Sequence, residues 1–411
     1  MQIINEIILY IMVGFLIIGA LDRILDQFGG SANVLKKIGL GFLGNAIDGV
    51  GKEFEEGFNS WGALALAMVG VIALAPVLAA ILSPIIIPLY SALGASPAMF
   101  GTTLLANDMG GYFLAKELVT ENGVVTDYAS WMYAGLILGS MMGPTIVFTI
   151  PVGIGIIDKK DRPSLALGIL AGIVTIPIGC IAGGLIAIYS SITTPEGAPI
   201  IFSYSLVFTN LIPIVVFSAL ISIGLWKIPN LMIKGFMIFA KLLVALITIG
   251  LASIVFETLI GIPLIPGLEP IVPIIGDTPG LDIRALEVVS RIALILAGAY
   301  PMVFLVSKWF KKPLTKLGTK LGVSEVSAVG FIATLANCIP MFKILSNMDE
   351  RGKVINIAFA VSAAFTLGDH LGFTAAVKPD MIFPVMVGKL TAGITAILVA
   401  MIVAPKNKLS N

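Results

Sequence analysis

The stretch LANDMGG at residues 105–111 interrupts an apolar run that extends from residue 97 to residue 118. It places an amide, a carboxylate and two adjacent glycines at the centre of a segment as long as a membrane span. Lipid cannot hydrogen-bond the N–H and C=O groups that such an interruption frees, so the segment must be buried in protein or face a watery cavity. The stretch predicts a re-entrant helical hairpin near 97–118 with a functional site at its tip.

A second apolar run, at 324–345, is interrupted in the same way by TLANCIP at residues 334–340. The sequence LGAS at 93–96 precedes the first run, and LGVS at 321–324 precedes the second. We therefore expect a second re-entrant hairpin near 324–345. The shared order of elements around the two runs predicts an internal repeat, as is common in transporters.

The composition is that of a membrane protein. Hydrophobic residues make up 58% of the 411 residues and charged residues only 12%, which excludes a soluble enzyme. Since a span needs about 20 mostly apolar residues, the sequence predicts about nine transmembrane helices. They fall at 3–21, 61–83, 130–157, 164–189, 203–226, 235–260, 286–306, 354–376 and 382–404. The fold class is thus an all-α polytopic membrane protein with nine spans and two re-entrant hairpins.

Charge in the loops orients the chain. Basic residues are concentrated in the loops at 23–52, 158–162, 227–234, 308–320 and 351–353 and in the tail at 406–408. The positive-inside rule places these segments in the cytoplasm, which puts the N-terminus outside and the C-terminus inside the cell. With nine crossings the second copy of the repeat is inverted. We predict a first repeat over 1–190, a linking transmembrane helix at 203–227 and a second, inverted repeat over 233–405.

Two further features bear on architecture. The polar, glycine-rich segment 33–59 is predicted to lie along the inner interface, and a solvated loop is an equal alternative. Small residues recur at four-residue spacing in Gly168 and Gly172, and again in Gly179 and Gly183. This spacing lets transmembrane helices approach closely, so these glycines are interpreted as packing faces.

The tip of the first hairpin supplies the first candidate site residues. Ionisable groups at membrane depth are expensive, so Asp108 is predicted to contact a substrate or a coupling ion. The alternative is that Asp108 only caps the following half-helix. Asn107 and, at the second tip, Asn337 offer both hydrogen-bond donors and acceptors, which suits a hydroxyl. They could instead satisfy the broken-helix backbone.

The stretch LGDHLGF at 367–373 places Asp369 and His370 inside the predicted span 354–376. A charge there needs a partner or a water-lined cavity, and a proton-linked role is one hypothesis. The alternative is an Asp–His pair that only holds two helices together. An intramembrane aspartyl protease would use Asp108 and Asp369 as its acid–base pair, but Thr366 stands where its motif requires a glycine.

The sequence indicates no cofactor or metal. With two cysteines, Cys180 and Cys338, and one histidine, it lacks the soft ligands of a zinc or iron–sulfur site. Lys and Arg number 25 against 24 Asp and Glu, so there is no basic surface for nucleic acid. The expected partner is the lipid bilayer. A homo-oligomer is allowed, although no residue pattern identifies a subunit interface.

Several longer strings together resemble the bacterial ethanolamine-utilisation transporter (EutH) family across nearly the whole chain. These are ILDQFGGSA at 24–32, FEEGF at 54–58, DMGG at 108–111 with FLAKE at 113–117, GPTIVF at 143–148, GIVTIPIGCIAGG at 172–184 and LGDHLGF at 367–373. The resemblance implies a permease of the bacterial inner membrane. Such a permease imports ethanolamine for the cobalamin-dependent ethanolamine ammonia-lyase. The resemblance carries over no binding residues.

This expectation gives the candidate residues a chemistry. A primary amine has a reference pKa of about 10, so it crosses lipid poorly as the ammonium form and needs a protein path. Asp108 would neutralise the ammonium group, and Tyr112 or Phe113 would add cation–π contact. Asn107 or Asn337 would bond the hydroxyl. The alternatives are a gated channel or a carrier for another small amine.

Overall fold

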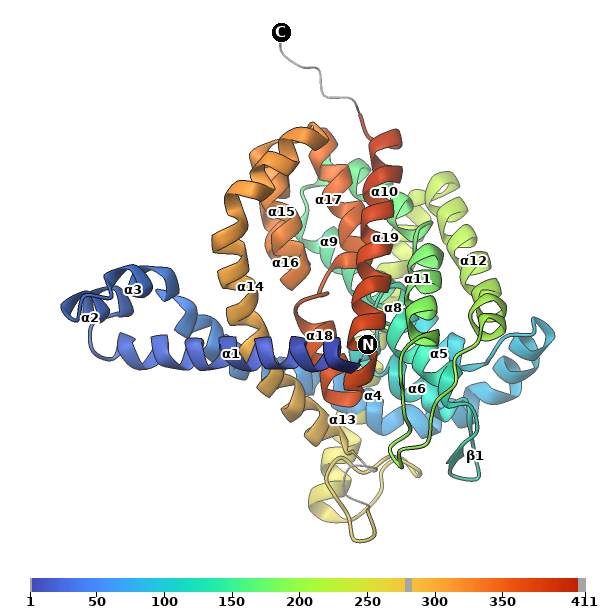
Figure 1. The fold of residues 1–411 in the computed structure, drawn as a ribbon. Coiled ribbons are helices and arrows are strands. Elements are labelled where there is room, and N and C mark those ends of the chain that lie inside the picture. Colours follow the sequence, from blue (N-terminus) through green and yellow to red (C-terminus); the bar gives the residue numbers. More distant parts are fainter. Residues whose placement is uncertain (1, 278–282, 406–411) are drawn as a thin grey trace.

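The computed structural model describes residues 2–277 and 283–405, apart from the side chains of residues 310–312 and 314–321 within one helix. Its long elements are all helices, and its only described strands form one short hairpin (Figure 1). The protein is thus an all-α polytopic membrane protein. The basic tail at 406–408, which contributed to the predicted orientation, lies outside the described residues.

The elements of the first half are α1 (Gln2–Asp26), α2 (Ser31–Lys37), α3 (Gly41–Ile47), α4 (Val50–Ala92), α5 (Ala98–Leu104), α6 (Gly111–Glu117), β1 (Thr120–Glu121), β2 (Val124–Val125), α7 (Tyr128–Met132), α8 (Met142–Pro144), α9 (Ile150–Ile156), α10 (Arg162–Ile173) and α11 (Ile176–Ile188). The second half has α12 (Tyr204–Lys227), α13 (Pro229–Ile260), α14 (Ala285–Leu321), α15 (Glu325–Ala336), α16 (Cys338–Ile344), α17 (Glu350–Ala363), α18 (Asp369–Val377) and α19 (Ile382–Val403). Short 3₁₀ turns and two π-helical turns, at Tyr133–Leu138 and Thr145–Thr149, join some of these helices.

Seven described helical stretches are long and apolar enough to cross a membrane, and an eighth is formed if the bent pair at 128–156 is one span. Eight of the nine predicted spans correspond to these stretches. The ninth, at 354–376, is not one continuous helix, because the chain divides there into α17 and α18. The prediction of an unbroken helix was wrong at that point: Phe365 adopts a left-handed conformation with φ of 63°, which a helix cannot accommodate.

Both interrupted runs form pairs of short helices. In the first run α5 and α6 flank a 3₁₀ turn at Asn107–Met109 and pack closely, since a Cβ added at Gly101 would lie 2.9 Å from the backbone nitrogen of Ala115. In the second run α15 is followed directly by α16. The helix–turn–helix form of both runs is therefore observed, while their entry and exit on one side of the membrane stays a prediction.

The N-terminal segment forms an arm in which α2 and α3 lie at the far end of α1 (Figure 1), and Lys308 of α14 donates to the carbonyl groups of Asn45 and Ala46 in α3. Its fold depends on Asp22, which is fully buried. One carboxylate oxygen of Asp22 accepts from the backbone N–H of Gly51 at 2.7 Å, and the other accepts from the hydroxyl of Ser31. Segment 33–59, for which an interfacial position and a solvated loop were equal alternatives, contains most of α2, all of α3 and the beginning of α4.

Glycines let the core helices approach as predicted. A side chain at Gly168 or Gly172 would collide with Ile357 or Val361 of α17, and one at Gly179 would collide with α19. These glycines are therefore packing faces. In contrast, α1, α12 and α13 expose many large apolar side chains, which suits contact with lipid.

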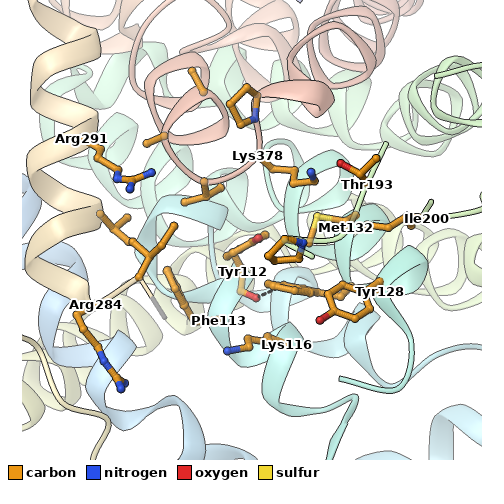
Figure 2. Close-up of a pocket in the computed structure, with 18 of the residues that line it drawn as sticks. Tyr112, Phe113, Lys116, Tyr128, Met132, Thr193, Ile200, Arg284, Arg291 and Lys378 are labelled. Carbon is orange, nitrogen blue, oxygen red and sulfur yellow. Dashed lines mark hydrogen bonds between the residues drawn. The ribbon is translucent and has the colours of Figure 1, made fainter. Parts of the chain in front are cut away.

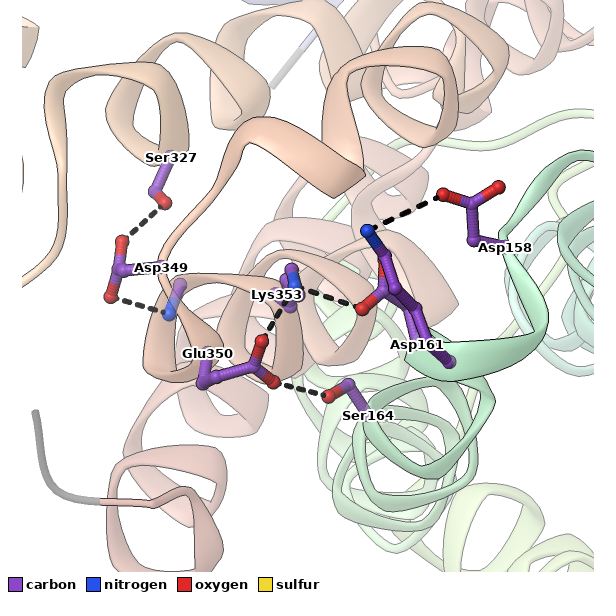
Figure 3. Close-up of polar contacts among 9 residues, drawn as sticks. Asp158, Asp161, Ser164, Ser327, Asp349, Glu350 and Lys353 are labelled. Atoms are coloured by element: carbon purple, nitrogen blue, oxygen red, sulfur yellow. Dashed lines mark hydrogen bonds and ion pairs between the residues drawn. The ribbon is translucent and has the colours of Figure 1, made fainter.

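A buried ion pair joins the beginnings of α10 and α17 (Figure 3). The ammonium group of Lys353 lies 2.8 Å from Asp161 and 2.6 Å from Glu350. Next to it, Asp349 caps α17 and accepts from the hydroxyl of Ser327 on α15. The network therefore ties together helices from the two halves of the chain.

This network yields a stability prediction. Lys353→Met should lower the free energy of unfolding by about 3 kcal/mol, because it leaves the buried carboxylate of Asp161 without its partner. Thermal unfolding in detergent measures the change. Lys160→Met is the matched control, since Lys160 is exposed and its carboxylate partner Asp158 lies 3.8 Å away. Equal melting temperatures for the two variants would contradict the assignment.

Candidate functional site

The tip of the first hairpin is seated in a broken helix. The segment 128–156 bends by 40° near Gly139, and the carbonyl group of Gly139 accepts from the backbone N–H of Asn107 at 2.9 Å. A Cβ added at Gly143 would overlap the carbonyl oxygen of Leu105. Only a glycine at 143 therefore lets the tip approach this closely. Gly110, with φ of 84°, provides the left-handed turn that begins α6.

The tip of the second hairpin meets the other break in the same manner. The backbone N–H of Phe365 donates to the carbonyl of Thr334 at 3.2 Å, and that of Leu367 donates to Leu335 at 2.9 Å. A Cβ at Gly368 would overlap the carbonyl oxygen of Ala336. Each break thus obtains hydrogen-bond partners from a hairpin tip, which is what membrane depth requires of irregular backbone.

Two predicted site residues come together between these junctions. Nε2 of His370, at the beginning of α18, lies 3.9 Å from a carboxylate oxygen of Asp108 on the first tip. The side chain of His370 is 2% exposed and that of Asp108 is 17% exposed. Residues 262 positions apart therefore form one interior site, which the pairing of tip and break creates.

A lysine that the sequence analysis did not select completes this site. Lys389 of α19 is 1% exposed. Its ammonium group lies 2.9 Å from Nδ1 of His370 and donates to the carbonyl oxygen of Ser140 at the first break. An ammonium has donors only, so Nδ1 accepts, and the imidazole carries its proton on the Nε2 that faces Asp108. The signal was the single charge within the predicted span 382–404.

Asp369 faces a different neighbour. Its carboxylate accepts a hydrogen bond from the hydroxyl of Tyr300 on α14 at 2.8 Å. Asp369 and His370 therefore do not form the Asp–His pair considered from the sequence. Tyr300 was also missed, because nothing in its local sequence shows that it points at a carboxylate of α18.

The two tip asparagines differ. The Oδ1 of Asn337 accepts from the N–H of Ile339 at 2.9 Å and so caps α16. Asn107 is fully buried, and neither atom of its side-chain amide has a hydrogen-bond partner among the described residues. Buried polar groups normally have partners. Of the two asparagines, Asn107 is therefore the one whose side-chain amide has hydrogen-bonding groups that the described structure does not use.

A cavity of about 310 Å³ lies beyond the site, and Figure 2 shows its lining. Tyr112 and Phe113, the predicted aromatic residues, contribute to this lining rather than to the charged site. Both rings contact the buried Phe373 of α18, with centroids 5.6 Å and 6.5 Å away. Since Phe373 lies one turn after Asp369 and His370 on α18, its ring contacts connect the wall of the cavity to the helix that carries these two residues.

Between α13 and α14, Glu269 and Arg284 line the cavity. The guanidinium group of Arg284 pairs with both Glu269 and Asp277. Hydrogen bonds from Arg284 and from the backbone N–H of Ile274 lower the pKa of Asp277 to about 2. This carboxylate therefore stays ionised and anchors the segment over most of the pH range.

Among the described residues, Asp22, Asp26 and Asp48 are close enough to share a metal ion. However, both oxygens of Asp22 already accept hydrogen bonds from the protein. The buried Asp22 therefore has a structural role in the arm.

Together, the apolar helices, the two tip–break junctions and the buried ionisable groups define a polytopic membrane protein with a polar site in its interior. The comparisons give the family. The pattern of the family described as "Ethanolamine utilisation protein, EutH" matches residues 4–403, and this chain belongs to that family.

Named relatives support this membership. The chain is 60% identical to the "Probable ethanolamine permease EutH" of Salmonella typhimurium, over 98% of this chain and 96% of the relative. It is 59% identical to the protein of the same name in Escherichia coli, over the same shares, and 54% identical to that of Listeria monocytogenes, over 98% and 94%. No solved structure matches the chain.

The first junction gives a test of the close approach. Gly143→Ala should abolish transport or reduce it at least about tenfold, because its Cβ would displace the tip that carries Asp108. Gly155→Ala is the matched control, since nothing lies within 4 Å of a Cβ there. Uptake of labelled ethanolamine into proteoliposomes that contain equal amounts of either variant measures the effect. If Gly143→Ala keeps full uptake, the close approach of the tip to residue 143 is not required for transport.

The ion pair of Arg284 with Asp277 gives a prediction of pH dependence. The folded pKa of Asp277 is below its ordinary value of 3.8, so its stabilisation is present above about pH 4 and lost as the pH falls toward 2. Hydrogen exchange of the Ile274 amide, corrected for intrinsic rate, should report this loss. In Arg284→Gln the guanidinium group that lowers this pKa is absent, so the stabilisation should be lost at a higher pH, toward pH 4. The same profile in both proteins would contradict the role of Arg284.

Proposed function

We propose that this chain imports ethanolamine across the bacterial inner membrane, that it carries the ammonium form, and that the site between the two junctions binds it. The relatives that it matches are named as probable ethanolamine permeases. The observation that carries the assignment of the site is the convergence of Asp108 and His370, at 3.9 Å, where a hairpin tip meets a helix break. Ionisable groups at such a place are functional by default.

The chemistry of the substrate fits this site. Ethanolamine has an ammonium group at neutral pH and a hydroxyl two carbons away, so it needs a carboxylate and an uncharged hydrogen-bonding group close together. Asp108 supplies the carboxylate. The adjacent Asn107 supplies a buried amide whose donors and acceptor are unused, and it would bond the hydroxyl. A hydrogen bond to such a group gives strong discrimination, because an analogue without the hydroxyl leaves the amide unpaired.

The residues that line the cavity support an entrance from outside the cell. The cavity is lined by Thr193, Glu269 and Lys378, which come from three loops or turns that alternation of the predicted spans places outside. Asn5, near the N-terminus, accepts from the backbone N–H of Phe383 and donates to the carbonyl of Asp380. This contact places the beginning of the chain at the same end of the molecule, in keeping with an outside N-terminus.

The same order of a hairpin, a broken helix and a further long helical stretch occurs twice, once in each half of the chain. This order supports the proposed inverted repeat and a mechanism of alternating access. In that mechanism the aromatic rings of Tyr112, Phe113 and Phe373 form the outer barrier. The substrate passes from the cavity to the site when they separate.

Energy for uptake need not come from a second ion. Moving one positive charge inward is favoured by about 2.3 kcal/mol per 100 mV, which corresponds to roughly fifty-fold accumulation. A carrier of the ammonium form therefore accumulates ethanolamine from the membrane potential alone.

The proposal predicts a specific defect. Asp108→Asn keeps the shape of the side chain but removes the counter-charge, so labelled ethanolamine uptake into proteoliposomes should fall about ten- to hundredfold. Uptake by the native chain should be saturable and should increase when the interior is made negative. Initial rates over a range of potentials measure both effects.

The control is Asp158→Asn, because this carboxylate is 60% exposed in a loop and touches no part of the site. Its uptake should equal that of the native chain. If Asp108→Asn takes up ethanolamine as fast as the native chain does, the counter-charge for the ammonium group does not lie at the first tip. If the native chain itself takes up no ethanolamine, the proposed substrate is wrong.

A further inference from the structure

Four basic side chains line the cavity, and one of them has a different kind of partner from the other three. Arg284, Arg291 and Lys378 each form an ion pair with a carboxylate. Lys116 of α6 forms no ion pair among the described residues, and its ammonium group lies over the ring of Trp131, 5.9 Å from the ring centroid. The contact of Lys116 is therefore with an aromatic face instead of an anion.

The ring of Trp131 belongs to an aromatic wall of the cavity (Figure 2). The ring centroids of Tyr112 and Tyr128 lie 4.8 Å and 5.7 Å from that of Trp131, and all three residues line the cavity. The indole N–H of Trp131 donates to the backbone carbonyl of Tyr112 at 2.9 Å, which fixes the orientation of the ring. The faces of such rings attract cations, and that of tryptophan attracts them most strongly. This wall is therefore suited to bind an ammonium group.

The ammonium group that covers this ring has the chemistry of the proposed substrate. Lys116 and ethanolamine both have primary ammonium groups at neutral pH. The distance of 5.9 Å is close to the limit of about 6 Å for a cation–π contact, so the ring holds the lysine weakly. A flexible aliphatic stem joins the ammonium group to the backbone, so it can leave the ring without a movement of α6. A second ammonium group can then take its place.

We propose that the face of Trp131 is an outer binding site for ammonium groups, that Lys116 occupies this site when no substrate is bound, and that an incoming ammonium group displaces it. The proposal rests on the proposed function and deepens it, because it adds a first binding site in the cavity that leads to Asp108. One cation leaves the ring as another arrives, so the same ring never has to hold two positive charges. The exchange also keeps binding weak, which a transport path needs in order to release the substrate inward.

Binding of tetramethylammonium to the native chain and to two variants tests the proposal. This probe has the quaternary ammonium group that aromatic faces recognise, and it has no N–H donor for Asp108. Lys116→Met removes the competing ammonium group, so the affinity measured by calorimetry should increase about three- to tenfold. Lys116→Arg should bind the probe more weakly than the native chain does, because a guanidinium group stacks better on an aromatic ring. No binding of the probe by Lys116→Met would overturn the proposal.

A double variant separates competition from charge repulsion. In Trp131→Leu the shared site is absent, so adding Lys116→Met should give no gain in affinity for the probe. If Lys116 only repelled cations from the cavity, Lys116→Met would increase the affinity by the same factor with or without Trp131, and Lys116→Arg would bind the probe as the native chain does. Either result overturns the proposal. The opposite effects of Lys116→Met and Lys116→Arg test it even if Trp131→Leu does not fold.

Uptake into proteoliposomes then connects the site with transport. Lys116→Met should lower the KM for labelled ethanolamine about three- to tenfold, because the outer site is empty when the substrate arrives. The control is Lys159→Met, which changes an exposed lysine in the turn between α9 and α10 and should keep the native KM. An unchanged KM in Lys116→Met would overturn the place of the site on the substrate path. If the native chain takes up no ethanolamine, the proposed function fails, while binding of tetramethylammonium still decides whether the aromatic site exists.

Discussion

The structure depends on one constraint: backbone N–H and C=O groups that leave a helix at membrane depth must find partners in the protein. Two helices of this chain are broken, near Gly139 and between Ala363 and Asp369. A hairpin tip bonds each break through main-chain groups. Glycines at 143 and 368 allow these contacts, because a side chain at either position would overlap a carbonyl group of the tip. Each break therefore needs a tip as a hydrogen-bond partner, and each tip needs a glycine near the break in order to approach it.

The chemistry of the site follows from this arrangement. The first tip brings Asp108, the second break brings Asp369 and His370, and α19 passes close enough for Lys389 to bond both the histidine and the first break. Each group alone would be expensive to bury, and together they satisfy most of one another's charge and hydrogen-bonding capacity. What remains without a partner is the side-chain amide of Asn107. In the proposed function this amide bonds the hydroxyl of the substrate, and Asp108 binds its ammonium group.

Much of this could be predicted from the sequence, because the informative residues are exceptions to an apolar background. The interruptions at 105–111 and 334–340 located both tips, and they selected Asp108 and Asn107. The left-handed residue Phe365 could not be predicted, since its conformation is imposed by bonds to Thr334 and Leu335. For Asn337 the sequence left two interpretations open, a bond to a hydroxyl and a bond to the broken-helix backbone. In the structure its side chain accepts from the backbone N–H of Ile339, as the second interpretation predicts.

The sequence by itself determined the membrane class, the positions of most helices, the two tips and the family, since these depend on composition, local periodicity and long shared strings. Only the tertiary structure decided which ionisable groups meet. Lys389 is 249 positions from its partner Ser140 and Tyr300 is 69 positions from its partner Asp369, and nothing local to either residue indicates its partner. Their contacts arise because the tips and breaks fix how α14, α18 and α19 pack. For that reason the groups that make up the site could be named only once the fold was known.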